Sequence, residues 1–109
     1  MDAALPGHLQ ELRRGTVVVA SLMVLREPGY GYSLLETLSA AGFEVEANTL
    51  YPLLRRLEAQ GLLTSEWNTD EARPRKFYRT SDTGFALAGT LSHDWDQLDT
   101  ALRILKGES

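Results

Sequence analysis

Positions 49–63 read TLYPLLRRLEAQGLL, and this stretch decides the fold expected for the chain. Projected at 100° per residue, it gathers four leucines on one side of a helix: Leu50, Leu53, Leu54 and Leu57. The opposite side carries Pro52, Arg55, Arg56 and Ala59. The stretch therefore predicts an amphipathic helix with one face buried in a core and the other open to a partner.

Local signals mark the ends of this helix. Gly61 is expected to stop it after Gln60. Asn48 or Thr49 can cap its start, because their side-chain oxygens accept the free amide hydrogens of a first turn. Proline is tolerated only in that turn, so Pro52 prevents a much earlier start, and Thr49 suits it slightly better as the cap.

The segments on either side complete a recognisable order of elements. Helices are predicted over about 9–25, which Pro28 and Gly29 stop, and over 32–41, with Gly42 as C-cap. Segments 62–67 and 75–80 favour strands and flank a turn-rich segment, so they predict a hairpin. Ser81 can cap a final helix that reaches Lys106.

This order predicts a mainly α fold with a small β-hairpin (α+β). The specific form is a winged helix-turn-helix over 1–80, plus a C-terminal dimerisation helix over 81–109. A generic α+β domain is the competing interpretation, because short helices joined by tight turns occur in many folds. With 109 residues, the chain is expected to form one core.

Charge is unevenly distributed along the chain. The net charge of −4 at first argues against a nucleic-acid partner. However, four basic residues lie close together: Arg73, Arg75, Lys76 and Arg79. Acidic residues gather towards the C-terminus instead: Asp82, Asp94, Asp96, Asp99 and Glu108. One end of the protein is therefore expected to be basic and the other acidic.

Polar and basic side chains on the 49–60 helix and the hairpin favour double-stranded DNA as the partner. The helix supplies donors for base edges and phosphates: Asn48, Thr49, Tyr51, Arg55 and Arg56. At the hairpin tip, Arg73 and Arg75 can reach a minor groove or straddle phosphates. Alternation along a strand sends Lys76 and Arg79 to opposite faces. An ordinary solvated surface is the competing interpretation for either element alone.

A heptad stripe runs along the final helix. Its apolar residues recur at spacings of three and four: Ala88, Leu91, Trp95, Leu98, Leu102 and Leu105. Packing against the first helix of the same chain competes with pairing between two chains. We expect a two-fold homodimer, because a long helix after a small domain seldom buries its whole stripe within one protomer.

Several other classes of protein are disfavoured. The chain has no cysteine and no glycine-rich phosphate loop, and His8 and His93 lie far apart, so no enzyme and no cofactor are expected. His93 and Asp96 have the spacing of ordinary surface residues, so no metal site is expected. Zero cysteines and an apolar run at 17–25, shorter than the roughly 20 residues of a membrane span, fit a cytoplasmic protein without a membrane partner. A winged-helix adaptor that binds protein instead of DNA stays open as an alternative.

The 49–63 stretch resembles the signature helix of the PadR family of winged-helix transcriptional regulators. Other stretches resemble that family in the same order: RGT at 14–16, GYGY at 29–32, RPRKFY at 73–78 and TG at 83–84. The resemblance extends from Leu12 to about Leu105 and is closer than that to MarR-type winged helices. The single short C-terminal helix resembles the compact PadR subgroup.

This resemblance implies a repressor that binds a palindromic operator as a homodimer. It implies DNA contacts from Tyr51 and Arg55, with Tyr32 near the DNA backbone and Arg73, Arg75 and Lys76 on the wing. Compact members take planar apolar effectors at or near the dimer interface, which makes Trp95, with Leu91, the expected effector site. Simple packing of the Trp95 indole in the interface is the competing interpretation.

Overall fold

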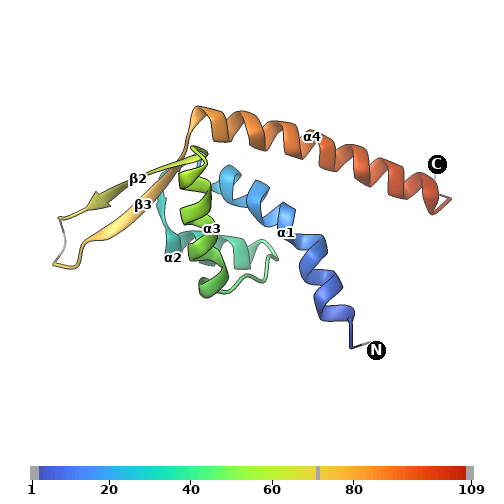
Figure 1. The fold of residues 1–109 in the computed structure, drawn as a ribbon, viewed down its shortest axis with the longest axis horizontal. Helices are drawn as coiled ribbons and strands as arrows, with labels where there is room; N and C mark the ends of the chain where they lie inside the picture. Colours follow the sequence, from blue (N-terminus) through green and yellow to red (C-terminus); the bar gives the residue numbers. More distant parts are fainter. Residues whose placement is uncertain (1–2, 71, 108–109) are drawn as a thin grey trace.

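The computed structural model describes residues 3–70 and 72–107. Its elements, in chain order, are α1 (Leu5–Val24), β1 (Gly29–Tyr30), α2 (Gly31–Ala40), α3 (Ala47–Ala59), β2 (Leu63–Asn68), β3 (Arg75–Thr80) and α4 (Asp82–Leu105). The predicted order of three helices, a hairpin and a long helix is confirmed. Figure 1 shows the hairpin projecting at one end of the molecule and α4 running to the other.

The core lies where the first three helices meet the base of the hairpin. Leucines dominate it, and eight of them are almost inaccessible to solvent: Leu22, Leu25, Leu34, Leu38, Leu50, Leu54, Leu57 and Leu63. Three of the four leucines predicted to share the buried face of α3 belong to this set, whereas Leu53 is only half-buried. Burial of this leucine face, more than intrinsic propensity, stabilises α3.

The sheet has one more strand than the predicted hairpin. Its order is β1-β3-β2, with β3 in the centre, and β1 pairs Gly29 with Tyr78 and Tyr30 with Phe77. A strand of two residues has no periodicity that a sequence could display. Its effect is structural, because β1 joins the central strand of the wing directly to the start of α2.

Both ends of α3 can be compared with the prediction. Gly61 does follow its last turn, with a φ of 76° that favours glycine. The prediction that Asn48 or Thr49 caps its start is wrong, because α3 begins at Ala47 after Glu46, without a side-chain cap. Pro52 consequently lies inside the helix, beyond the first turn. Proline has no amide hydrogen to donate to the carbonyl one turn earlier in the helix. This part of α3 is exposed, so water can hydrate that carbonyl instead.

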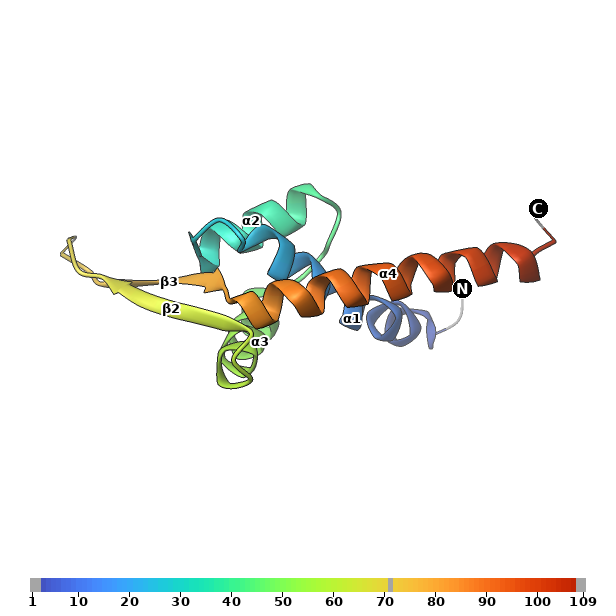
Figure 2. The ribbon, with the colours of Figure 1, turned by 90° about the horizontal axis from the view of Figure 1, so that it is seen from above.

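The first helix is longer than predicted and only half of it is buried. It begins at Leu5 instead of about Leu9, and its buried residues, Val17, Ser21 and Leu22, all lie in its second half. Figure 2 shows α4 crossing α1 and continuing towards the C-terminus beyond the core. No helix in the described parts of the chain is both long and apolar enough to cross a membrane.

The start of α4 is fixed by Ser81. Its hydroxyl accepts a hydrogen bond from the Gly84 amide at 3.0 Å and donates one to the Gly61 carbonyl at 2.6 Å. The predicted cap is thus confirmed. Gly84 packs against the main chain at Leu62, where a Cβ atom would overlap the carbonyl oxygen. The hydroxyl and the close approach together fix where α4 leaves the wing.

Candidate nucleic-acid interface

The exposed side of α3 is divided into three rows of residues. Because each residue turns by 100°, Asn48, Arg55 and Ala59 form the outermost row, and all three are exposed. Thr49 and Arg56 turn towards α1, with which they line a groove. Tyr51 and Glu58 turn towards the wing. The predicted DNA-binding residues of this helix therefore do not share one direction, and Arg55 and Asn48 have the most open positions.

Tyr51 and Tyr32 lie where α2, α3 and the wing meet. Both line a small cavity of about 240 Å³ that Tyr30, Arg75 and Lys76 also border. The ring of Tyr51 is half-buried against Gly31, where a Cβ atom would overlap it. Tyr32 is 61% exposed at the start of α2. Most of the Tyr32 side chain is thus accessible to a binding partner, whereas only part of the Tyr51 side chain is.

Arg75, at the outer end of β3, is held against Tyr30 of β1. Its guanidinium lies 3.8 Å from the centroid of the Tyr30 ring, a stacked cation–π arrangement. The Tyr30 hydroxyl accepts a hydrogen bond from Asn68 Nδ2 at 2.6 Å, and Phe77 contacts the Tyr30 ring edge-on. Arg73, nearer the tip, is exposed. These contacts orient Arg75 and leave Arg73 as the more open of the two.

Lys76 contacts α3 instead of pointing to solvent. Its ammonium lies 3.0 Å from Glu58 Oε1, and the Ser65 hydroxyl donates to Glu58 Oε2 at 2.5 Å. The hydrogen bond from Ser65, followed by that from Lys76, lowers the pKa of the Glu58 carboxyl. Arg79 is exposed, in agreement with the predicted alternation. Sequence reasoning missed Glu58, because its two partners lie on strands whose position relative to α3 no local pattern reveals.

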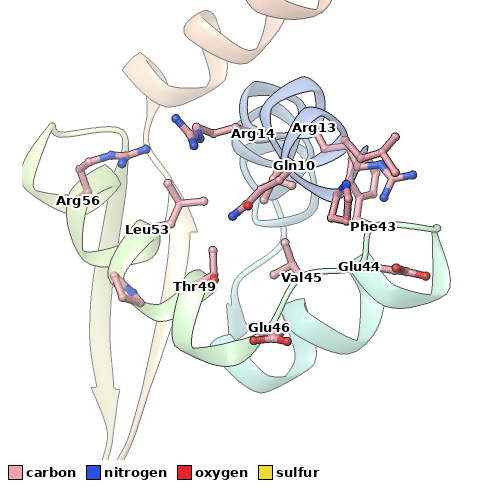
Figure 3. Close-up of a pocket in the computed structure, with 14 residues that line it drawn as sticks. Gln10, Arg13, Arg14, Phe43, Glu44, Val45, Glu46, Thr49, Leu53 and Arg56 are labelled. Carbon is pink, nitrogen blue, oxygen red and sulfur yellow. The ribbon is translucent and has the colours of Figure 1, made fainter. Parts of the chain in front are cut away.

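A groove of about 850 Å³ separates α3 from the first half of α1. Leu9, Val17, Phe43, Val45 and Leu53 supply apolar lining. Figure 3 shows Arg14 on α1 and Arg56 on α3 reaching towards one another across one end of it. Glu44 and Glu46, on the segment between α2 and α3, also line it. The surface next to the predicted DNA-binding side of α3 is therefore partly apolar and carries both basic and acidic side chains.

The heptad stripe of α4 is only partly accessible. Ala88 is 4% exposed and belongs to the protomer core, so it has almost no surface left for the dimer contact predicted from the sequence. Leu91 is half-buried, whereas Trp95, Leu98 and Leu102 are 51–57% exposed and Leu105 is 82% exposed. The stripe thus begins inside the protomer and continues as an apolar surface.

No group of three potential metal ligands lies together within residues 3–70 and 72–107. His93, which the sequence analysis compared with Asp96, lies on the exposed side of α4 with its Nε2 3.5 Å from Gln97 Nε2.

Comparison with known proteins gives one consistent family. The model of the transcriptional regulator PadR-like family matches residues 21–89. The transcriptional regulator Rv3488 of Mycobacterium tuberculosis is 41% identical over 81 residues, which cover 73% of each chain. The crystal structure of a PadR family transcriptional regulator from Eggerthella lenta superimposes with a TM-score of 0.86 at 48% identity, covering 93% of this chain and 90% of that one.

A more distant structure supports the fold alone. The PadR-like transcriptional regulator from Bacillus cereus is 24% identical, with a TM-score of 0.79 over 91% of this chain and 99% of that one. The α+β winged-helix fold expected from the sequence is thereby confirmed. The family match spans more than half of the chain, and on that ground the chain belongs to the PadR-like family of transcriptional regulators.

Proposed function

We propose that this transcriptional regulator is a repressor that binds a palindromic operator as a homodimer. The observation that carries the proposal is the open row of Asn48 and Arg55 on α3, next to a wing whose exposed tip holds Arg73. A helix that enters a major groove, flanked by a basic wing, combines base readout with attraction to phosphates.

Each contact has a separate role in this proposal. Arg55 and Asn48 read base edges, since arginine suits guanine and asparagine suits adenine. Thr49, Tyr51 and Arg56 contact DNA from the flanks of α3, and Tyr32 contacts the backbone from α2. Arg73 and Arg75 contact phosphates or the minor groove from the wing. The overall negative charge does not oppose this arrangement, because Asp94, Asp96 and Asp99 lie on α4, away from these residues.

The decisive experiment measures binding of the purified protein to the DNA upstream of its own coding sequence and of the adjacent operon. We expect tight binding to one palindromic segment and weaker, strongly salt-dependent binding to random-sequence duplex. Absence of binding to any DNA at low salt would favour the alternative function, a winged-helix adaptor that binds protein.

The homodimer part of the proposal rests on α4. Its stripe emerges from the protomer core at Ala88 and continues over Trp95, Leu98, Leu102 and Leu105, so an apolar surface continuous with the core is open to water. A second copy of α4 would cover it, with residues 81–109 as the dimerisation segment. Two-fold symmetry would then place two copies of α3 about 34–36 Å apart, one turn of duplex DNA.

We further propose a planar apolar effector at Trp95 and Leu91. Half of the Trp95 side chain is exposed and Leu91 is half-buried next to it on the stripe. Two-fold symmetry would bring two indole rings towards one another, an arrangement suited to stacking on a flat ligand. Such a ligand would release DNA by changing the spacing of the two α3 helices.

A further inference from the structure

We infer that Glu58 is a positioning residue that fixes the wing against α3, and that Lys76 serves this link instead of contacting phosphate. The inference rests on the proposed DNA-binding function, because it concerns how the two halves of that surface are held together.

One carboxylate joins three elements. Glu58 lies in the last turn of α3, and its two oxygens accept hydrogen bonds from Ser65 on β2 and Lys76 on β3. The Glu58 and Lys76 side chains are 33% and 29% exposed, so water competes only partly for the pair. Each oxygen has a different donor, so a tilt of the wing in either direction lengthens at least one bond. The carboxylate therefore fixes an angle as well as a distance.

The link acts on the outer half of the wing. The base of β3 is anchored by Thr80, whose hydroxyl donates to the Leu22 carbonyl at 2.7 Å and whose amide donates to the Leu25 carbonyl at 2.8 Å. Lys76 lies four residues further towards the tip, opposite Trp67 on β2. A narrow sheet bends and twists easily towards its outer end, where Tyr30 of β1 also contacts Asn68 and Arg75. Glu58 supplies an anchor at this outer position.

The charge of Lys76 is already compensated. Its ammonium lies 3.0 Å from the carboxylate of Glu58 and 5.4 Å from the centre of the buried Tyr78 ring. A phosphate that approached Lys76 would also approach the negative charge of Glu58 and gain little from the pair. Arg73 is exposed near the tip and suits a phosphate contact better.

The salt dependence of DNA affinity distinguishes a cation that contacts phosphate from one that only holds the wing in place. Each phosphate that a protein neutralises adds about 0.9 to the slope of log K against log salt concentration. We would measure this slope on random-sequence duplex DNA for the full chain and for Lys76→Gln, Glu58→Gln, the double variant and Arg73→Gln. Arg73→Gln is the matched control, because it removes a cation from the same hairpin.

We expect Lys76→Gln and Glu58→Gln each to weaken binding by about fivefold at every salt concentration, the effect of a partly buried charged hydrogen bond, with an unchanged slope. The double variant should bind about as well as either single variant, since both substitutions break one link. Arg73→Gln should lower the slope by about 0.9.

A second measurement reports on the wing without DNA. The Trp67 indole lies across the strand pair from Lys76 and is largely exposed, and Trp67→Phe identifies its NMR signal. We expect the heteronuclear NOE of this indole NH to fall in Lys76→Gln and Glu58→Gln, because the outer wing moves more freely, and to stay unchanged in Arg73→Gln.

A lower salt slope in Lys76→Gln, or tighter DNA binding by Glu58→Gln, would overturn the inference, since both results mean that Lys76 is available to phosphate. An unchanged NOE in both variants would overturn the positioning role. If the unmodified chain binds no DNA, the proposed function itself fails, and the NOE alone then decides whether Glu58 holds the wing.

Discussion

At Gly84 the first turn of α4 passes so close to the main chain at Leu62 that only a hydrogen atom fits between them. Gly89 lies on the same helix, and nothing lies within 4 Å of the position that its Cβ would take. The pair therefore separates the steric need for glycine from its general cost in a helix.

We predict that Gly84→Ala lowers the free energy of unfolding by about 2–4 kcal/mol, because a methyl group must push α4 away from a backbone carbonyl. Gly89→Ala should raise the same quantity by about 0.5–1 kcal/mol, the ordinary gain of alanine over glycine in a helix. Urea unfolding followed by circular dichroism measures both. Equal effects of the two substitutions would show that the close approach at Leu62 is unimportant.

The carboxyl of Glu58 gives stability a dependence on pH. Hydrogen bonds from Ser65 and Lys76 lower its pKa below the ordinary 4.5, so the folded state favours the ionised form more than the unfolded state does. The resulting stabilisation is fully present above pH 4.5 and is lost as the pH falls through the lowered pKa.

We expect Glu58→Gln to lower the free energy of unfolding by about 1 kcal/mol at neutral pH, the value of a partly exposed charged pair with its hydrogen bonds. The difference from the unmodified chain should shrink below pH 4.5 and disappear in stronger acid. Urea unfolding at a series of pH values checks this. Glu36→Gln, an exposed change on α2, is the control and should stay within about 0.5 kcal/mol of the unmodified chain throughout. A difference that persists undiminished in acid would contradict the prediction.

At the scale of elements, the proposed function gives α3 and the wing separate tasks. Arg55 is exposed on the outer row of α3 and is proposed to read bases, whereas Arg73 is exposed on the wing and is proposed to contact phosphates. Arg75 belongs to the wing but lies close to α3: its guanidinium is stacked on Tyr30, and the residue borders the small cavity beside α3. Substitutions on the two elements should therefore differ in kind.

We predict that Arg55→Ala weakens operator binding by about 1–3 kcal/mol and leaves binding to random-sequence DNA nearly unchanged. Arg73→Ala and Arg75→Ala should weaken binding to both DNAs. Fluorescence anisotropy with both duplexes across a salt titration measures the two classes of effect. If all three variants bind like the unmodified chain at every salt concentration, another surface contacts DNA.

At the scale of the whole molecule, α4 connects two copies of the winged helix in the proposed dimer. The stripe of Trp95, Leu98, Leu102 and Leu105 is exposed in the protomer, and Ile104 lies on the opposite side of the same helix with 66% of its surface exposed. Ile104 is therefore a control for a charge placed on α4 outside the stripe.

We predict a dimer at micromolar concentration that Leu98→Glu or Leu102→Glu converts to a monomer, because a buried unpaired carboxylate opposes association. Ile104→Glu should remain a dimer. Analytical ultracentrifugation distinguishes these states. A monomer before any substitution, or an oligomeric state that neither stripe substitution alters, would contradict the dimer.

The proposed effector site is tested at the same scale, because its proposed action depends on both protomers. Planar aromatic compounds should quench Trp95 fluorescence in a Trp67→Phe variant and release operator DNA, and Trp95→Ala should lose this response. Trp67, exposed on the wing, should report no binding in a Trp95→Phe variant. If the compounds release DNA equally well from Trp95→Ala, Trp95 does not bind the effector and only packs in the interface.

The sequence by itself determined every element whose signal is local. Leucine periodicity defined the helices, Gly61 ended α3, Ser81 capped α4, and the turn-rich segment between 68 and 74 defined the hairpin. It also placed Arg55 on the outer side of α3, because a helix fixes directions from spacing alone. Asn48, expected as a possible cap, joins that side only because α3 begins at Ala47.

Tertiary structure decided the features that need two distant segments. The strand β1 exists because β3 pairs with it, and Ala88 is withdrawn from the stripe because it packs into the core of the protomer. The start of α3 at Ala47 likewise differs from the start that local capping signals predicted. Lys76 was expected on DNA but is bound to Glu58, 18 residues away in sequence. Periodicity and capping act over a few residues, whereas the partner of a charged side chain or of a strand edge depends on how the whole chain folds.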